Sequence, residues 1–262
     1  MIELDAATVT AYAPAQPGTA VGTEQIRTLL EPTTCRLGER RVAIIGANGS
    51  GKSTLARLVN GLALPSAGRV LVDGLDTATD GAAVRQRVGF VFTDPDSQLV
   101  MPTALEDVAL SLRRRVPDGA ARDRLARAAL ERYGLGAHAH TSVHSLSGGQ
   151  KQLLALAGVL ATDPEVLVCD EPTTLLDLRW RRVVDEVLAT VDAQVLLVTH
   201  DLDAAAGCDR VLVVDEGRIV ADGAAPAALA HYRALMERPV ERGAPVSRVD
   251  AGAPFDPTGS AR

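Results

Sequence analysis

The fold is decided by residues 46–54, which read Gly46-Ala47-Asn48-Gly49-Ser50-Gly51-Lys52-Ser53-Thr54. This stretch matches the pattern G-x-x-x-x-G-K-[ST] and lies between a short apolar run, residues 41–45, and a segment that we expect to be a helix. The glycines let the backbone bend so that successive N–H groups and the helix N-terminus face phosphate groups. A plain glycine-rich turn is the alternative, but the runs on both sides favour a phosphate-binding loop. Lys52 would then contact the β- and γ-phosphates of a nucleotide, and Ser53 would supply a hydroxyl to Mg²⁺.

Lysine is almost absent outside this loop. Of the 27 basic residues, only Lys52 and Lys151 are lysines, and the other 25 are arginines. A compact ammonium fits where the planar fork of an arginine would not, as at a phosphate loop. The retained lysine therefore agrees with a phosphate contact at position 52.

The composition excludes several classes of protein. Apolar residues make up 47% of the 262 residues, which is enough to bury a core and argues against a disordered or fibrous chain. The net charge is −6 and only 3% of residues are aromatic, so we expect no nucleic-acid partner. The longest apolar run, residues 153–161, has nine residues. A membrane-spanning helix needs roughly 20, so we expect none.

We expect the protein to act inside the cell with its cysteines reduced. Residues 1–5 are acidic where a signal peptide would be basic and then apolar. Cys35, Cys169 and Cys208 lie far apart and form none of the close pairs typical of zinc or redox motifs. They are interpreted as packing residues.

Short apolar runs predict a parallel sheet. Residues 41–45, 166–169 and 195–199 are continuously apolar, as expected of strands covered on both faces. Between them, residues 150–161 have apolar side chains at helical spacing and are followed by Asp163-Pro164. Alternating strands and helices imply an α/β fold.

Other segments predict additions to this sheet. Residues 68–74 and 88–92 are short β-rich pieces, which we group with a β subdomain that precedes the sheet, whereas residues 104–160 are mostly helical. Residues 211–220 predict two strands joined by a turn at Glu216-Gly217. The stretch 237–262 is rich in proline and glycine, and we expect an unfolded tail.

A second anion site is predicted at the pentapeptide Leu146-Ser147-Gly148-Gly149-Gln150. It precedes the helical run, and Ser147 is well placed to cap the helix, whose N-terminus would then attract an anion. Alone, Ser-Gly-Gly could equally be a simple helix start. Together with the Lys52 loop, the chain resembles the ATP-binding-cassette (ABC) ATPases, whose signature is this pentapeptide and whose cofactors are ATP and Mg²⁺.

The resemblance implies a fold and its domains. It implies an α/β P-loop NTPase (RecA-like) fold with a parallel sheet core, an N-terminal antiparallel β subdomain and an inserted α-helical subdomain that carries the signature. We expect the ATP-binding domain to span residues 1–236, with the helical subdomain at about 94–162.

Two acidic residues end the apolar run 166–169. Asp170 and Glu171 are followed by Pro172, and an acidic turn at the end of a strand is the simpler alternative. The resemblance implies that Asp170 holds Mg²⁺ through water and that Glu171 is the general base that polarises the attacking water.

Three further contacts are implied by the resemblance. Residues 174–177 occupy the position of the family's D-loop, with Asp177 at its end, and cross the dimer interface. His200 follows the apolar run 195–199 as the switch histidine would, and should contact the γ-phosphate. Tyr12 is similar to the aromatic residue that stacks on adenine, although plain packing of this side chain is an open alternative.

One position departs from the family. Where these ATPases usually have Val-Phe-Gln, this chain has Val91-Phe92-Thr93, so the customary Mg²⁺-sensing glutamine is missing. Gln98 is shifted by five positions and does not inherit the role. We expect Thr93 to hold a water instead.

The resemblance also implies partners. The signature helix of one subunit closes over the nucleotide of the other, so this chain must pair with a copy of itself or a close relative. Residues 90–109 contain Asp94-Pro95-Asp96-Ser97-Gln98 and Glu106-Asp107-Val108, which resemble the ATPases of energy-coupling-factor (ECF) vitamin importers. The expected partners are a transmembrane coupling protein and a substrate-binding membrane component, with the chain at the cytoplasmic face of the membrane.

The transported molecule is the least determined part of the resemblance. Thr93, the loop residues 46–50 and the run 170–178 are most similar to the biotin-transport ATPases of the ECF group. Cobalt, nickel or another vitamin remains open as cargo. A soluble ABC ATPase for cluster assembly or DNA maintenance is the alternative from another class, although the long coiled-coil arms of the latter are absent.

Overall fold

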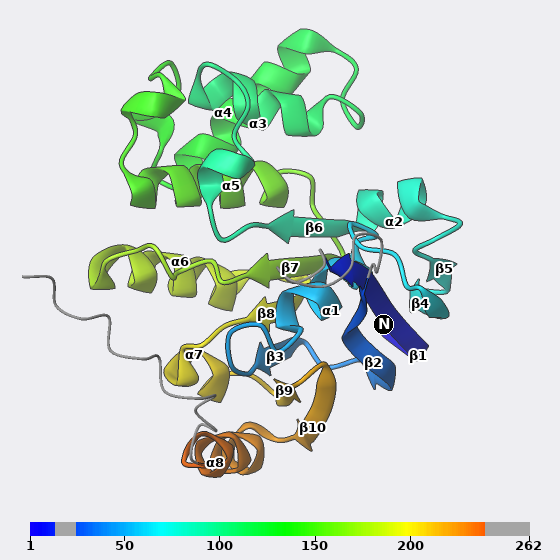
Figure 1. The fold of residues 1–262 in the computed structure, drawn as a ribbon. Helices are drawn as coiled ribbons and strands as arrows, with labels where there is room; N and C mark the ends of the chain where they lie inside the picture. The colour runs from blue at the N-terminus through cyan, green and yellow to red at the C-terminus, as the bar shows by residue number, and fades with distance from the viewer. Residues whose placement is uncertain (14–24, 239–262) are drawn as a thin grey trace, which may run out of the picture.

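A six-stranded sheet forms the centre of the molecule (Figure 1). The structure, a computed structural model, describes residues 1–13 and 25–238. The strand order is β10-β9-β3-β8-β7-β6, in which all strands run parallel except β10, which is antiparallel to β9. The strands are β3 (Arg41–Ile45), β6 (Val88–Val91), β7 (Val166–Asp170), β8 (Gln194–Val198), β9 (Arg210–Asp215) and β10 (Arg218–Gly223).

The predicted central strands are confirmed. The apolar runs 41–45, 166–169 and 195–199 form β3, β7 and β8, and every residue of β7 is buried. Continuous burial explains why these strands lack alternating polar residues. The turn at Glu216-Gly217 joins β9 to β10, as predicted, and both residues have positive φ, 44° and 76°.

A second, four-stranded sheet is antiparallel and has the order β2-β1-β4-β5. Its strands are β1 (Ile2–Ala13), β2 (Gln25–Leu37), β4 (Ala67–Val72) and β5 (Leu75–Asp76). The predicted β piece 68–74 lies here, in β4 and the turn that follows it. The prediction for residues 88–92 is wrong in its grouping, because Val88–Val91 form β6 at the edge of the central sheet. Local β propensity does not reveal which sheet a short apolar strand joins.

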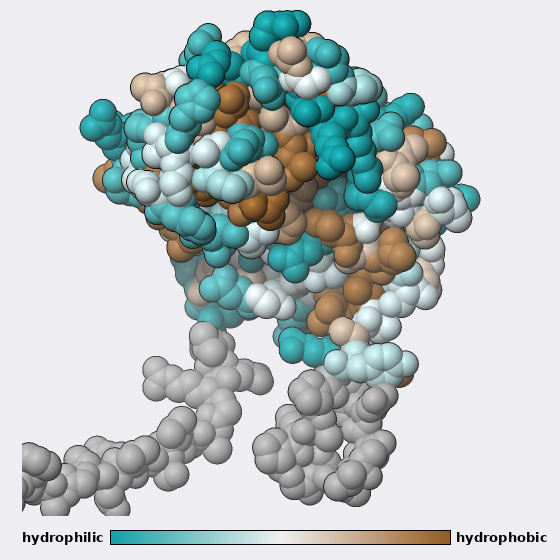
Figure 2. All heavy atoms as spheres, turned by 90° about the horizontal axis from the view of Figure 1, so that it is seen from above, coloured by the Kyte–Doolittle hydropathy of each residue, from teal (hydrophilic) through white to brown (hydrophobic). Residues whose placement is uncertain are grey.

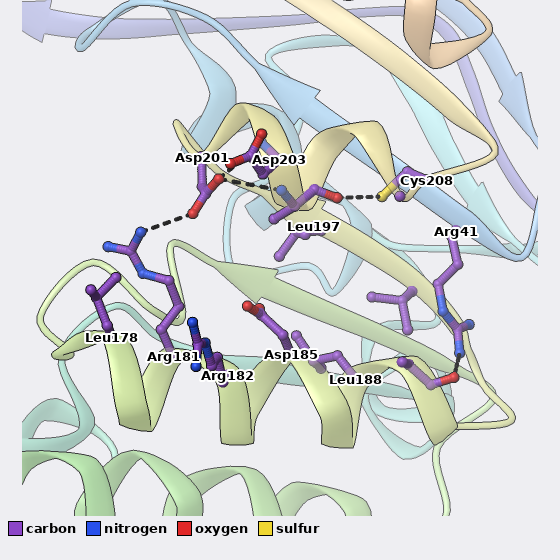
Figure 3. Close-up of a pocket in the computed structure, with 14 residues that line it drawn as sticks. Arg41, Leu178, Arg181, Arg182, Asp185, Leu188, Leu197, Asp201, Asp203 and Cys208 are labelled. Atoms are coloured by element: carbon purple, nitrogen blue, oxygen red, sulfur yellow. Dashed lines mark hydrogen bonds and ion pairs between the residues drawn. The ribbon is translucent and has the colours of Figure 1, made fainter.

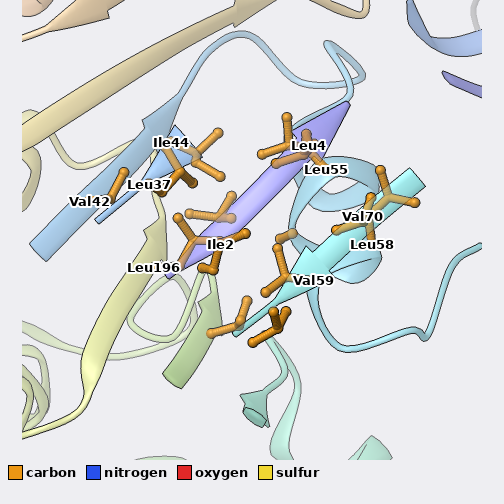
Figure 4. Packing of buried hydrophobic residues seen from close by; sticks show 14 of the residues in the cluster. Ile2, Leu4, Leu37, Val42, Ile44, Leu55, Leu58, Val59, Val70 and Leu196 are labelled. Carbon is orange, nitrogen blue, oxygen red and sulfur yellow. The ribbon is translucent and has the colours of Figure 1, made fainter. Parts of the chain in front are cut away.

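The main core lies between the two sheets (Figure 4). Helix α1 (Lys52–Val59) follows β3 and buries Leu55, Leu58 and Val59 against both sheets. Ile2 of β1 and Leu196 of β8 belong to the same cluster and are fully buried. The helix that follows the phosphate loop is therefore fixed on both sides.

A helical subdomain is inserted between β6 and β7 and lies above the central sheet in Figure 1. Its helices are α3 (Ala104–Leu112), α4 (Gly119–Arg132) and α5 (Gly148–Leu160), with 3-10 turns η1 (Pro95–Ser97), η2 (Gly136–His138) and η3 (Val143–Ser145). It has its own core, which includes Val108, Leu130 and Leu154. The signature pentapeptide lies at the start of α5.

Four other helices complete the described chain: α2 (Gly81–Arg87), α6 (Leu178–Thr190), α7 (Leu202–Ala206) and α8 (Ala225–Met236). Within residues 1–13 and 25–238, no helix is both long enough and apolar enough to cross a membrane. The predicted unfolded tail, residues 237–262, lies outside the described residues from position 239 onward.

Candidate nucleotide-binding site

The phosphate loop occupies the carboxyl end of β3, and close contacts require glycine at two of its positions, Gly46 and Gly51. A Cβ on Gly46 would lie 2.0 Å from the carbonyl oxygen of Val214, and a Cβ on Gly51 would lie 2.7 Å from that of Leu29. Gly51 also has φ 106°, which L side chains rarely adopt. Asn48 and Gly49, at the tip, are exposed. The loop therefore packs on its neighbours while its tip faces outward.

The turn between β9 and β10 supports this loop. The Gly217 N–H donates to the Ser50 carbonyl oxygen at 2.8 Å, and the Glu31 N–H donates to the Gly217 carbonyl oxygen at 2.8 Å. The sequence predicted the turn but not this contact, because no local pattern links positions 50 and 217. Gly217 is thus a supporting residue that sequence reasoning missed.

Lys52 is a buried cation without a charged partner in the described part of the chain. Its side chain is 6% exposed, and Nζ donates to the carbonyl oxygens of Gly46 and Ala47, each at 2.9 Å. It forms no ion pair with any residue of 1–13 or 25–238. Burial lowers the pKa of Lys52, while the carboxylates of Glu171 and Asp170 oppose that shift. A buried ammonium in this state would be stabilised by a bound anion.

Two oxygen ligands suited to Mg²⁺ meet beside Lys52. The Ser53 hydroxyl donates to Asp170 Oδ1 at 2.8 Å, and the Arg57 guanidinium lies 3.5 Å from Oδ2. Asp170 ends β7 and is 2% exposed. A hydroxyl and a carboxylate are hard oxygen donors, which Mg²⁺ prefers together with nucleotide phosphates. The residues present therefore fit the cation that the sequence predicted.

Glu171 lies next in the chain, with two donors on one of its oxygens. His200 Nδ1 lies 2.6 Å from Glu171 Oε2, and the Thr174 hydroxyl donates to the same oxygen at 2.8 Å. The histidine contact is a hydrogen bond to an ionised carboxylate when Nδ1 carries the proton. Glu171 has φ 54°, an uncommon value for a residue other than glycine. The structure thus brings Glu171 and His200 together, from the ends of β7 and β8.

The start of α5 is capped as predicted. Ser147 Oγ accepts from the Gln150 N–H at 3.3 Å, and Gln150 Oε1 accepts from the Ser147 N–H at 2.8 Å. Ser147 and Gly148 are exposed, whereas Gly149 is buried. Among the described residues, no hydrogen bond or ion pair joins residues 147–150 to the phosphate loop. One chain therefore does not bring these two predicted anion sites into contact.

Among the described residues, neither Asp177 nor Tyr12 forms a hydrogen bond or ion pair with Lys52, Asp170 or Glu171. Asp177 Oδ1 accepts from the Trp180 N–H at 2.9 Å and caps α6. Tyr12 lies in β1 opposite Ile26, and the two residues are 73% and 67% exposed. An exposed aromatic ring is available for stacking, so the adenine contact stays a prediction.

Thr93 contacts the residue that ends β7. Its hydroxyl donates to the Asp170 carbonyl oxygen at 2.7 Å, which uses its proton, while its oxygen can still accept from a water. The water that the sequence predicts at this position stays a prediction. Gln98 Oε1 accepts from the Phe92 N–H at 3.2 Å, which keeps Gln98 away from the carboxylates. The end of β6 is therefore tied directly to the residue that ends β7.

A groove of about 590 Å³ lies between α6 and α7 (Figure 3). Arg181 bridges its two sides through an ion pair with Asp201 at 3.0 Å. Burial and the nearby Asp201 raise the pKa of Asp185 within it. No predicted site residue is among those that line this groove. The predicted nucleotide site is thus separate from this groove.

Comparisons with known proteins agree with this geometry. Residues 33–174 match the model of the ABC transporter family. An ABC transporter ATP-binding protein of Deinococcus radiodurans is 49% identical over 81% of this chain and 94% of its own length. The biotin transport ATP-binding protein BioM of Rhizobium etli is 44% identical over 80% of this chain and 93% of its own length.

A relative named as an energy-coupling factor subunit also matches. The energy-coupling factor transporter ATP-binding protein EcfA1 of Symbiobacterium thermophilum is 48% identical over 68% of this chain and 64% of its own length. Among solved structures, the dimeric post-hydrolysis state of the ATP-binding cassette MJ0796, bound to ADP and Pi, has a TM-score of 0.74 at 29% identity. That similarity covers 86% of this chain and 99% of the other. Because the family model spans more than half of the sequence and the relatives match most of it, the chain belongs to the ATP-hydrolysing subunits of ABC transporters.

Proposed function

We propose that this chain is the ATPase of an energy-coupling-factor importer and that residues 46–54 hold the phosphates of Mg²⁺-ATP. The observation that carries the proposal is the buried Lys52 ammonium, which has two carbonyl partners and forms no direct ion pair in the described part of the chain. Helix α1 adds free N–H groups, because its N-cap residue, Gly51, has no side chain to cap them. An anion at this point would satisfy both the lysine and the helix.

Each residue near the loop has a proposed task. Ser53 and Asp170 would hold Mg²⁺, which neutralises phosphate charge during the reaction when it is bound. Glu171 would take the proton of the attacking water with Oε1, because Oε2 already accepts from His200 and Thr174. His200 would both orient this carboxylate and contact the γ-phosphate.

The signature would act on the nucleotide of a second subunit. Ser147, Gly148, Gly149 and Gln150 form the start of α5, and Ser147 and Gly148 are exposed. Because a single chain carries one phosphate loop and one signature, two chains placed head to tail would complete two sites. A second copy of this chain is the simplest partner, and a close relative would serve equally. Asp177 and the adjoining residues 174–176 would lie at their interface.

The helical subdomain carries surfaces suited to a membrane partner. A groove of about 490 Å³ is lined by apolar side chains from α3 and the segment before it, including Met101, Leu105 and Leu110, together with polar and charged side chains such as Glu106 and Arg113. Val100, nearby in sequence, is 69% exposed. Figure 2 shows apolar patches on this side of the molecule. We propose that a transmembrane coupling protein docks here, which would hold the chain at the cytoplasmic face of the membrane, with a substrate-binding membrane component beside it.

Biotin is the proposed cargo. Support comes from the relatives of Rhizobium etli and Rhodobacter capsulatus that are named biotin transport ATP-binding proteins, at 44% and 40% identity. No residue of this subunit is proposed to touch the vitamin, so the cargo depends on the membrane component.

Co-purification from native membranes in detergent tests both parts of the proposal. The tagged chain should recover an integral membrane coupling protein and a membrane protein that binds labelled biotin. Biotin uptake by cells should be lost when Glu171 is replaced by glutamine. Recovery of a membrane component that binds cobalt, nickel or another vitamin would overturn the cargo alone. Recovery of soluble proteins only would overturn the importer.

A further inference from the structure

The second glycine of the signature is covered by the only tryptophan of the chain. A Cβ on Gly149 would lie 2.1 Å from Cγ and 2.2 Å from Cδ2 of the Trp180 ring. These ring atoms are near the root of the side chain and cannot move aside easily. By contrast, a Cβ on Gly148 would meet nothing within 4 Å. The two adjacent glycines therefore have opposite surroundings, and Gly149 is glycine because Trp180 occupies the space of its side chain.

Trp180 also belongs to the segment that follows the proposed interface loop. It lies in the first turn of α6, and its N–H donates to Asp177 Oδ1 at 2.9 Å. Its ring, with Val183 and Val187, packs against the core of the helical subdomain. Trp180 thus contacts Asp177, at the end of residues 174–177, through its backbone N–H, and the start of α5 through its ring.

From this geometry we propose that Trp180 is a positioning residue that holds the signature in a fixed orientation relative to residues 174–177. The proposal rests on the two-subunit site argued above, because both segments would then face the same partner. Two chains could close correctly only if the two contact segments of each chain keep their relative positions. Trp180 would make them a single rigid unit.

The need for such a support follows from the sequence of the helix start. Two consecutive glycines, Gly148 and Gly149, begin α5, and glycine restricts the backbone to the helical conformation less than alanine does. The attraction of a helix N-terminus for anions is confined to its first turn. Without support, the Gly-Gly turn would not keep its N–H groups oriented toward the phosphate. The flat indole ring packed on Gly149 restricts the motion of this turn.

Substitution of Trp180 tests the proposal in a Glu171→Gln background, where ATP-bound dimers accumulate. Trp180→Ala should raise the protein concentration needed for half-dimerisation in Mg²⁺-ATP about tenfold, measured by sedimentation velocity. Trp180→Phe, which keeps an aromatic ring, should restore most of the loss. Val187→Ala is the matched control, because it truncates another α6 side chain that packs on the same helical core, whereas the atoms nearest to the Cβ position of Gly149 all belong to Trp180. ADP affinity of the single subunit should change less than twofold in every variant.

A compensating pair keeps the test valid if Trp180→Ala folds poorly. Gly149→Ala should prevent dimerisation, because its methyl group would overlap the indole ring. Adding Trp180→Val should recover at least part of the dimer, because the smaller side chain leaves room for the methyl group. No recovery in the double variant, while Trp180→Val alone still dimerises, would mean that the methyl group of Gly149→Ala acts on something other than the indole ring, and would contradict the proposal.

The outcomes separate this proposal from the one that it rests on. If the Glu171→Gln parent with Trp180 intact does not dimerise in ATP, the two-subunit site itself fails. If the parent dimerises and Trp180→Ala does so equally well, only the role of Trp180 is overturned. If Val187→Ala weakens the dimer as much as Trp180→Ala does, general packing of α6 explains the effect and the proposal is again overturned.

Discussion

The phosphate loop and the signature both lie at the N-terminus of a helix, yet the two helix ends differ in how their N–H groups are capped. The start of α1 has no side-chain cap, and its first residue is the buried Lys52. The start of α5 is capped by its own Ser147 and Gln150. Within the described residues, the first end has free donors and a cation that forms no direct ion pair, both suited to an anion, whereas the second has already satisfied part of its hydrogen-bonding capacity.

Their surroundings differ in the same sense. Hydrogen bonds from Gly217 to Ser50 and from Ser53 to Asp170 hold the phosphate loop against the central sheet. The signature faces outward at Ser147 and Gly148, with Trp180 behind it. The difference indicates that the contacts within one chain are enough to fix the phosphate loop, whereas the signature is exposed and free to contact a second chain. Changes at the loop should therefore act on nucleotide binding, and changes at the signature should act on association.

The largest expected effect is on ATP turnover, at Glu171, where the phosphate loop of one chain and the signature of another would enclose the reacting phosphate. Glu171→Gln keeps the shape of the side chain but removes the base, so ATP turnover should fall about a thousandfold. Steady-state hydrolysis and equilibrium binding of ATP measure the two properties separately. ATP affinity should stay within about twofold of the parent value, since the phosphate loop is unchanged. Normal turnover by this variant would remove Glu171 from the role of base.

A second effect should be confined to the phosphate loop. Lys52→Ala removes the buried ammonium, and loss of charged hydrogen bonds to phosphate should weaken ATP and ADP binding about a hundredfold. Isothermal titration calorimetry measures both. The other lysine provides a control: Lys151 pairs with Asp96 at 2.7 Å, so Lys151→Ala should leave ADP affinity unaltered. Equal losses in the two variants would indicate a general effect of charge.

At the signature the expected change is smaller and of another kind. Ser147→Ala removes the cap of α5, worth about 1 kcal/mol of helix stability, and the hydroxyl offered to the partner's nucleotide. ATP-driven dimerisation should weaken about tenfold, while ADP affinity of the single subunit should not change. If ADP binding fell together with dimerisation, the separation of the two regions would be wrong.

The smallest effect should come from Thr93. Thr93→Val removes the hydrogen bond that the Thr93 hydroxyl donates to the carbonyl oxygen of Asp170. A neutral hydrogen bond contributes about 1 kcal/mol, so turnover should fall about fivefold. The Mg²⁺ concentration for half-maximal hydrolysis should rise with it. Thr93→Ser keeps the hydroxyl and should behave like the parent, and a defect of equal size in both variants would contradict this role.

Much of this fold could be predicted because its signals are local. Three continuously apolar runs identified β3, β7 and β8, and Glu216-Gly217 marked the turn between β9 and β10. Ser147 was predicted as a helix cap from its position alone. Each of these features depends on residues that are close in sequence, so a short stretch of the chain is enough to predict it.

The remaining features depend on contacts between distant residues. The sequence contains no sign that Trp180 fills the space beside Gly149, that Gly217 supports Ser50, or that Thr93 donates to Asp170. The placement of residues 88–92 in the wrong group has the same cause, because pairing with β7 decides where β6 lies. For the candidate site, the sequence identified the charged residues but not the contacts that position them.

Mixing two inactive variants tests most directly whether the nucleotide site is shared between chains. Lys52→Ala lacks a working phosphate loop, and Ser147→Arg lacks a working signature, so neither alone should hydrolyse ATP. In a head-to-tail dimer that contains one of each, one site is intact, and random mixing should restore about one quarter of the wild-type activity. Activity that stays at background while mixed dimers form would show that each chain carries its own complete site, and would contradict the account.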